Sequence, residues 1–364
     1  MYLRRLTLRN YRNFIEQTYI TNANISVIYG RNAQGKTNLL ESIYLLGNYK
    51  SFRTQRNSEL IRNNTAKAEI HALIATGGVE HHITMSIDRD SKNITVDGKK
   101  SITPEKISGL LRPVLFSPEE IGIINGPPAE RRALIDRAIF HTNPEFLILA
   151  RKFNRVLRQR NKILRTDAQA QELKIWSEYL VQYGAAIRDE RKKYVTRLVP
   201  RLKKIYQQIV CDRPDERENI DLIINEGDDI HSANQLRDEL DRVLEREKIH
   251  KTTLAGPQRD DPLFKIDGRL LRQFGSQGQK KSYILAFKIA QIEDLEKQFG
   301  VPPLLLLDDF AGELDFGRRQ FLFEYLCQHR GQVFITTTDK NILSNTIFHD
   351  VDYYCVDQGI LSRD

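Results

Sequence analysis

One short segment combines residue types that suit the binding of nucleotide phosphates. Residues 30–37 read Gly-Arg-Asn-Ala-Gln-Gly-Lys-Thr and fit the pattern GxxxxGK[ST]. Glycines let backbone N–H groups point at phosphate oxygens, the Lys36 ammonium reaches the β- and γ-phosphates, and the Thr37 hydroxyl ligates Mg²⁺. A strand-like run precedes the segment and a helical pattern follows it, as this chemistry requires. We therefore predict a site for ATP and Mg²⁺ whose nucleotide-binding residues are Gly30, Arg31, Asn32, Ala33, Gln34, Gly35, Lys36, Thr37 and Asn38.

A second segment, near residue 305, supplies the carboxylates that such a site needs. Four leucines at 304–307 run directly into Asp308 and Asp309. A buried parallel strand that ends in carboxylates is typical of a Walker B strand. Asp308 is predicted to hold Mg²⁺ together with Thr37, and Asp309 to orient the attacking water as a base, so that Asp309 and Lys36 are the catalytic candidates. The alternative is an ordinary acidic turn at the end of a strand.

Three further segments follow the order found in ATP-binding-cassette ATPases. Residues 276–279 (Ser-Gln-Gly-Gln) precede a predicted helix before the Walker B strand, residues 313–315 follow that strand, and the threonines at 336–338 end the next one. In those ATPases the Ser-Gly turn of one subunit closes on the γ-phosphate held by the other. The nucleotide-binding candidates here are Ser276, Gly278, Gln279, Asp315 and Thr338. A helix N-cap is the competing interpretation for the serine, and plain β-propensity for the threonines.

The elements that must position these residues follow from the apolar pattern. Residues 1–125 contain alternating strand-like runs and one helix at about 37–46, whereas residues 128–250 have the spacing of long helices. The last part, residues 252–364, returns to alternating strands and helices, with helices at about 280–299 and 316–329 and strands at 304–307, 333–337 and 353–356. We predict an α/β fold in which a helical arm, without sustained heptads, interrupts a nucleotide-binding domain.

Composition excludes several classes of protein. The chain has 364 residues, with 56 Lys and Arg against 48 Asp and Glu, a net charge of +8 and three widely spaced cysteines. These values exclude a disulfide scaffold and low-complexity classes. No apolar run approaches the ~20 residues that span a bilayer, so we expect a cytoplasmic protein with no membrane partner. The excess of basic over acidic residues is compatible with nucleic acid as a partner.

Charge is distributed unevenly within the helical part. Residues 131–204 hold 19 Lys and Arg against 7 Asp and Glu, and residues 212–247 hold 5 against 13. The segment 151–165 has seven basic residues and no acid, so no neighbouring carboxylate of the same helix neutralises it. Arg155, Arg158 and Lys162 are the DNA-binding candidates in this segment. A solvated helix face, or a docking surface for an acidic partner protein, is the alternative.

Taken together, these motifs resemble the RecF family of bacterial recombination-repair proteins over essentially the whole chain. The residues that carry the resemblance are Leu6 to Asn13, Gly30 to Asn38, Leu40 to Ile43, Ser51 to Thr54, Phe116 to Glu120, Gly126 to Pro128 with Arg131 and Arg132, Gly256 to Asp261, Ser276 to Gln279 and Leu307 to Asp309. The sequence departs from the family pattern at Gln258, where His is common, and at Gly312, where Ser is common. Glu119 and Glu120 lie where related ATPases use a glutamine.

The resemblance implies a fold, an activity and partners. The fold is a P-loop ATPase head of the ATP-binding-cassette type, formed by residues 1–125 and 252–364, with a mainly helical arm at 126–251 and no long coiled coil. The activity is ATP hydrolysis to ADP and phosphate, weak and stimulated by DNA, used as a switch. The implied partners are double-stranded DNA and gap junctions, a second copy of the chain in an ATP-dependent homodimer, RecR, and indirectly RecO and RecA. Two other functions remain open: the ATP-binding subunit of a membrane transporter-like system, and a scaffold that does not hydrolyse ATP.

Overall fold

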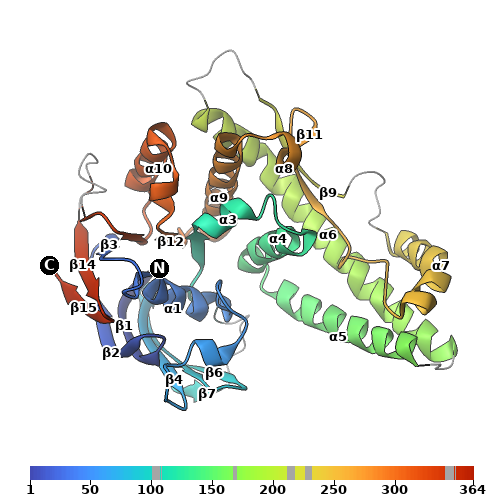
Figure 1. The fold of residues 1–364 in the computed structure, drawn as a ribbon, viewed down its shortest axis with the longest axis horizontal. Coiled ribbons are helices and arrows are strands. Elements are labelled where there is room, and N and C mark those ends of the chain that lie inside the picture. The colour runs from blue at the N-terminus through green and yellow to red at the C-terminus, as the bar shows by residue number, and fades with distance from the viewer. Residues whose placement is uncertain are drawn as a thin grey trace. The chain divides into compact units, whose positions relative to one another are not determined.

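The computed structural model describes residues 1–100, 107, 109–166, 170–210, 218–225, 232–340, 348 and 350–364. The chain divides into two compact units, one of residues 1–121 and 291–364 and one of residues 122–290 (Figure 1). Unit 1 is therefore built from both ends of the chain. Within the ranges given above, no helix is both long enough and apolar enough to cross a lipid bilayer.

A six-stranded, mostly parallel sheet forms one layer of unit 1. Its order is β15-β14-β3-β13-β12-β8, and only β15 runs antiparallel to its neighbour. The strands are β3 (Ile25–Tyr29), β8 (Pro113–Phe116), β12 (Leu304–Asp308), β13 (Val333–Thr337), β14 (Val351–Asp357) and β15 (Ile360–Arg363). The leucine run of β12 is completely buried, as a central parallel strand requires. This sheet brings the end of β3, where the phosphate loop starts, to the same edge as the ends of β12 and β13.

The second layer of unit 1 is an antiparallel sheet with the order β2-β1-β4-β5-β6-β7. Its strands are β1 (Tyr2–Tyr11), β2 (Phe14–Ile20), β4 (Ala68–Thr76), β5 (Val79–Ile87), β6 (Lys92–Val96) and β7 (Lys99–Lys100). Helix α1 (Lys36–Asn48) is buried along nearly its whole length, and its leucines join apolar residues of both sheets in one core. Because most residues of α1 are buried, packing fixes the position of this helix behind the phosphate loop.

Shorter helical segments complete unit 1. They are the 3₁₀ turns η1 (Asn57–Glu59) and η2 (Phe310–Glu313) and the helices α3 (Pro118–Gly122) and α10 (Phe316–Gln328). Helix α9 (Gln277–Phe299) belongs to both units, since the division falls between residues 290 and 291. The predicted strands and helices of the two ends of the chain are thus confirmed, with boundaries shifted by a few residues.

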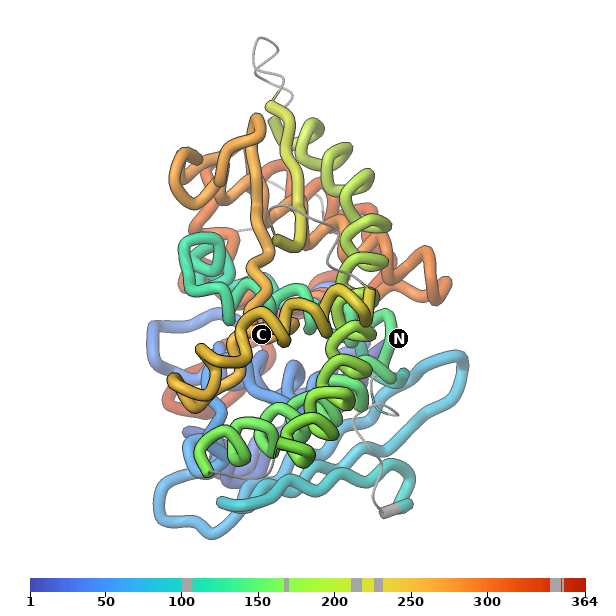
Figure 2. Tube along the Cα trace, turned by 90° about the vertical axis from the view of Figure 1, so that its right-hand side faces the viewer, coloured from blue at the N-terminus to red at the C-terminus, as the bar shows by residue number. Residues whose placement is uncertain are grey.

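Unit 2 is built mainly of helices that pack along one another. They are α4 (Pro128–Thr142), α5 (Glu145–Arg165), α6 (Ala170–Ile209), α7 (Ala233–His250) and the short α8 (Leu271–Phe274). Helix α6 is the longest, and α5 packs along its first half as an antiparallel partner (Figures 1 and 2). The described residues contain no coiled coil that extends beyond this compact unit, as predicted.

Unit 2 also contains a small sheet that the sequence analysis missed. Strands β9 (Ile220–Ile224), β10 (Pro262–Ile266) and β11 (Arg269–Leu270) form an antiparallel sheet in the order β11-β10-β9. The sequence pattern predicts helices for the acidic stretch around β9. The five residues of this strand are too few to show an alternating period against their charged surroundings. Residues 252–290 pack as part of unit 2, whereas the prediction from the sequence places residues 252–364 in the ATPase domain. Residues 211–217 and 226–231 of the acidic stretch lie outside the described residues.

Candidate nucleotide-binding site

The phosphate loop joins β3 to α1 through backbone conformations that only glycine adopts readily. Gly30 and Gly35 have φ angles of 149° and 122°. A Cβ on Gly30 would lie 2.3 Å from the Val356 carbonyl oxygen, and one on Gly35 would lie 2.7 Å from Asn13 Nδ2. Both glycines of the motif are therefore favoured by φ and by a close neighbour, which is backbone at Gly30 and the Asn13 side chain at Gly35.

The Lys36 side chain lies within the loop that it is predicted to serve. It is 4% exposed, and its Nζ donates to the carbonyl oxygens of Gly30 at 2.8 Å and Arg31 at 3.1 Å. Burial lowers the pKa of this ammonium, and the Asp309 and Asp308 carboxylates partly oppose that effect. Carbonyl oxygens alone stabilise an ammonium less than phosphate oxygens would, so the charge is poised for an anionic ligand.

Thr37 and Asp308, the two predicted metal ligands, are in direct contact. The Thr37 hydroxyl donates to Asp308 Oδ1 at 2.9 Å, although the residues are 271 positions apart in the chain. The Thr336 hydroxyl donates to the same oxygen at 2.7 Å. Burial raises the pKa of Asp308, while the two hydroxyls act in the opposite direction. The structure thus brings a hydroxyl and a carboxylate, both oxygen ligands of the kind that Mg²⁺ prefers, to one point at the sheet edge.

Asp309 follows in a left-handed backbone conformation, with φ at 47°. Its backbone N–H donates to Thr336 Oγ1 at 3.0 Å, so Thr336 contacts both acids of the pair. Asp309 is also close enough to Lys36 to affect its pKa. The side chain of Glu119 on α3 contributes to raising the pKa of Asp308, which places a third carboxylate in this neighbourhood.

Thr336 was not among the predicted site residues, although its neighbour Thr338 was. Thr338 lies exposed, one residue beyond the end of β13, whereas Thr336 is buried within it. The parallel register pairs Asp308 with Thr336, and this pairing decides which threonine reaches the acids. A sequence-based signal existed in the threonine run itself, but the register was needed to choose among its members.

Asn13, which is not among the predicted site residues, fixes the loop from outside. Asn13 Nδ2 donates to the Gln34 carbonyl oxygen at 2.7 Å, and Asn38 Nδ2 donates to Asn13 Oδ1 at 2.8 Å. The Gly359 N–H donates to the same Gln34 oxygen at 3.1 Å. Asn13, in the turn between β1 and β2, thereby links the loop to Asn38 of α1, and Arg53 donates to Asn38 Oδ1 at 2.7 Å.

The remaining predicted nucleotide-binding residues lie at helix N-termini. Ser276 is the N-terminal residue before α9: its Oγ accepts from the Gln279 N–H at 3.1 Å, and Gln279 Oε1 accepts from the Ser276 N–H at 2.6 Å. Gly278 lies in the first turn of that helix. Asp315 caps α10 by accepting from the Arg318 N–H at 3.0 Å. The capping alternative for Ser276 is thus present in the structure, and the cap leaves the hydroxyl proton of Ser276 available as a donor.

The basic segment 151–165 forms the greater part of α5, and one of its cations is not at the surface. Arg160 is 1% exposed and donates to Glu247 Oε2 at 2.6 Å, so a carboxylate from outside the helix neutralises part of this segment. That acid comes from α7, far along the chain, and same-helix spacing could not reveal it. Arg155, Arg158 and Lys162 are exposed, and among the described residues none of the three has an ion-pair partner.

Comparison with known proteins decides the family. The RecF/RecN/SMC N terminal domain model matches residues 2–360. The "DNA replication and repair protein RecF" of Syntrophotalea carbinolica is 43% identical over 363 residues, covering 99% of each chain. The chain belongs to the RecF family. The RecF of Trichlorobacter lovleyi is 36% identical over 367 residues, covering 100% of this chain and 98% of that one.

Solved structures agree with this membership. A structure described as the recombination mediator protein RecF with ATP, in the RecFOR pathway, has a TM-score of 0.89 and 30% identity, and covers 100% of this chain and 97% of that one. An Smc head domain from Pyrococcus furiosus has a TM-score of 0.56 at 15% identity and shows the fold alone. The fold is that of an ATP-binding-cassette ATPase head with an inserted arm, as the sequence predicted.

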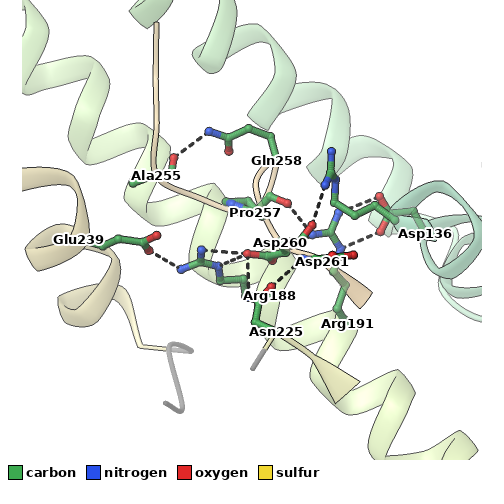
Figure 3. A network of polar contacts seen from close by, with 11 residues as sticks. Asp136, Arg188, Arg191, Asn225, Glu239, Ala255, Pro257, Gln258, Asp260 and Asp261 are labelled. Atoms are coloured by element: carbon green, nitrogen blue, oxygen red, sulfur yellow. Dashed lines mark hydrogen bonds and ion pairs between the residues drawn. The ribbon is translucent and has the colours of Figure 1, made fainter. Parts of the chain in front are cut away.

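A RecF family signature, residues 256–261, forms the polar centre of unit 2 (Figure 3). Asp260 is 2% exposed and accepts from Arg188 Nε at 3.0 Å and from Arg191 Nη1 at 3.1 Å, both on α6. Arg191 also forms a two-point ion pair with Asp136 of α4, at 2.8 and 2.9 Å. This signature therefore ties two helices to the loop before β10, and it is explained by structure within the arm.

The second acid of the signature holds another buried arginine. Arg131 of α4 is 1% exposed and donates to Asp261 Oδ1 through Nε at 2.8 Å and Nη2 at 2.6 Å. At Gln258, where the family commonly has His, Nε2 donates to the Ala255 carbonyl oxygen at 2.7 Å. At the other departure, Gly312 in η2, an added Cβ would meet nothing within 4 Å.

Proposed function

We propose that this protein is an ATP-gated DNA-binding switch of recombinational repair and replication. Two copies bind MgATP, close on each other with the nucleotides between them, and hold double-stranded DNA near single-strand gaps. The complex acts with RecR, and through RecO it helps to load RecA. ATP hydrolysis is slow, is stimulated by DNA and resets the switch. We place the protein in the cytoplasm.

The observation that carries this proposal is the contact of Thr37 and Asp308 beside Lys36, at the edge where β3, β12 and β13 end. The donors fit MgATP because they are a hydroxyl, a carboxylate and an ammonium next to a glycine cradle. When bound, Mg²⁺ would neutralise charge on the β- and γ-phosphates. A RecF of known structure is described with ATP. The relative from Syntrophotalea carbinolica is named a DNA replication and repair protein.

Each residue of this chain has a definite task in the proposal. Lys36 would move its ammonium from the loop carbonyls to the phosphate oxygens, Thr37 and Asp308 would hold the metal, and Asp309 would orient the attacking water. Thr336 fixes the backbone turn on which Asp309 stands. Ser276, Gly278, Gln279 and Asp315, all at helix N-termini, approach the nucleotide of the partner subunit.

DNA is proposed to bind through its phosphates. The exposed cations Arg155, Arg158 and Lys162 are the contacts that α5 offers. Closing two copies on one duplex doubles the number of phosphates neutralised, and counterion release scales with that number. We therefore expect duplex binding that does not depend on base sequence, that requires ATP, and that weakens steeply as salt rises.

The test is the fluorescence anisotropy of a labelled duplex titrated with protein over a range of salt concentrations, with and without MgATP. The proposal predicts a steeper salt dependence with ATP, and a weaker affinity when Arg155, Arg158 and Lys162 are all replaced by Ala. Arg246→Ala on α7, which removes an exposed cation elsewhere on unit 2, serves as the matched control. Duplex affinity that responds neither to ATP nor to the triple replacement would reassign α5 to a partner protein. ATP turnover measured with and without that duplex separates the switch from a scaffold that does not hydrolyse ATP.

A further inference from the structure

One surface of unit 2 combines aromatic rings with the cations of α5. Trp176, Tyr179 and Tyr183 follow each other at spacings of three and four residues on α6, so they form one stripe along the helix. The ring centroids of Trp176 and Tyr179 are 6.1 Å apart, and those of Tyr179 and Tyr183 are 6.4 Å apart with planes only 13° from parallel. The stripe is not core, because Tyr179 is 46% exposed and the other two rings are partly exposed.

The adjoining face of α5 carries positive charge. Lys152, Arg155 and Lys162 recur at helical spacing on this helix, and all three are exposed. Lys152 Nζ lies 5.9 Å from the centroid of the Tyr183 ring, so the cationic row and the aromatic stripe are neighbours. The two helices pack side by side in both views of the molecule (Figures 1 and 2).

Two acids of α6 lie beside the aromatic residues, and one of them is paired with another helix. Between residues 146 and 166, α5 has no acidic residue. Glu178, which is next to Tyr179 in the sequence, is paired with Arg237 of α7 through two contacts of 3.1 and 2.8 Å. Glu172 lies one turn before Trp176, at the opposite end of the stripe from the contact between Lys152 and Tyr183.

We propose that this aromatic and basic surface binds unpaired DNA, with the bases stacked on Trp176, Tyr179 and Tyr183 and the phosphates held by Lys152, Arg155 and Lys162. Rows of aromatic rings beside a cationic groove are the general means of holding a single strand, because every base has a π face and every nucleotide a phosphate. Duplex DNA hides its base faces and engages only the cations. The inference rests on the proposed function, and it gives the arm a way to distinguish the single-stranded side of a gap from the duplex side.

The protein carries its own reporter for this surface, because Trp176 is the single tryptophan of the chain. The experiment titrates the full-length protein with two oligonucleotides of about 12 nucleotides, one of thymidine and one abasic, and follows tryptophan emission. Both probes have the same phosphates, and only one has bases to stack. We expect saturable quenching by the thymidine probe and an affinity on the order of tenfold or more above that of the abasic probe, since stacking contributes about that factor for each base.

Matched variants assign the effect to the rings and the cations. Tyr179→Leu keeps apolar volume but removes a ring, and it should lower the thymidine affinity toward that of the abasic probe, while Tyr179→Phe should retain it. Replacing both Arg155 and Lys162 by Ala should weaken binding of both probes and reduce the salt slope by roughly 1.4, since each phosphate contact to a single strand contributes about 0.7. Arg246→Ala should change neither.

Equal affinities for the two probes, or a Tyr179→Leu protein that binds thymidine like the parent, would overturn the proposal. Quenching by a poly-glutamate peptide that is lost in Tyr179→Leu would also overturn it and make the surface a protein-docking site. The anisotropy of a labelled duplex with MgATP is measured on the same proteins. If duplex binding is intact while the probes fail, only this inference is wrong; if duplex binding is absent in the parent protein, the proposed function is wrong.

Discussion

At the scale of single residues, the proposed function depends most directly on Lys36. Its buried ammonium donates to the carbonyl oxygens of Gly30 and Arg31, which phosphate oxygens would replace. We expect Lys36→Met to abolish ATP binding, because the phosphates would lose the buried ammonium held within the loop. Calorimetric titration with MgATP measures this directly, with circular dichroism as the control for folding. Unchanged ATP affinity in the folded variant would remove Lys36 from the site.

Thr336 offers a finer test, because its hydroxyl contacts Asp308 and the backbone of Asp309 at once. Thr336→Val keeps the shape but leaves the Asp309 N–H without its acceptor, at a cost of about 1–3 kcal/mol. We expect the turnover rate at saturating ATP to fall at least tenfold while ATP still binds, and Thr336→Ser to restore it. Steady-state phosphate release measures the rate. A valine variant that turns over ATP like the parent would mean that the Asp309 turn holds its shape without Thr336.

At the scale of elements, the N-terminus of α9 has two interpretations that one substitution separates. Ser276 caps α9 within unit 2, and we propose that it contacts the nucleotide held by a partner subunit. We expect Ser276→Arg to leave ATP binding intact and to prevent ATP-dependent dimerisation, whereas Ser276→Thr, which retains a capping hydroxyl, should behave like the parent. Calorimetry and light scattering report the two properties separately. Equal loss of both would place the complete nucleotide site within one chain.

The ionic centre of unit 2 predicts a stability effect. Asp260→Ala would leave the buried Arg188 and Arg191 with one carboxylate each, and breaking such a buried pair costs about 3 kcal/mol. Chemical denaturation followed by the emission of Trp176, which lies in this unit, measures the loss. Glu245→Ala breaks a solvent-exposed pair with Lys248 and should cost less than about 1 kcal/mol. Similar losses in the two variants would mean that Asp260 does not hold the unit together.

Sequence reasoning succeeded where a pattern is local. The phosphate loop, the leucine strand ending in Asp308 and the helix after residue 276 could each be read from a few neighbouring residues. It missed what depends on distant partners: the choice of Thr336 within a threonine run, the pairing of Arg160 with Glu247, and strand β9, which is defined by its partner β10. Register and tertiary ion pairs join positions up to hundreds of residues apart, and periodicity contains no information about them.

At the scale of the whole molecule, the proposed function is that of an ATP-gated switch whose closed state is a dimer. In the proposed dimer, each chain supplies the phosphate loop of unit 1 to its own nucleotide and the N-terminus of α9 to the nucleotide of the second copy. Because neither half of the proposed site would be complete alone, we expect nucleotide and partner to stabilise each other's binding. Asp309→Asn removes the proposed base while keeping its size, so ATP should bind and remain unhydrolysed, and the closed state should persist.

Sedimentation velocity tests this central claim most directly. The parent protein and Asp309→Asn are measured without nucleotide, with MgATP, and with MgATP and gapped DNA. The account predicts a monomer without nucleotide, a dimer with MgATP that is most persistent in Asp309→Asn, and a dimer bound to DNA in the third condition. Lys36→Met should remain monomeric throughout. A parent protein and an Asp309→Asn variant that bind MgATP yet sediment as monomers with and without DNA would contradict the account.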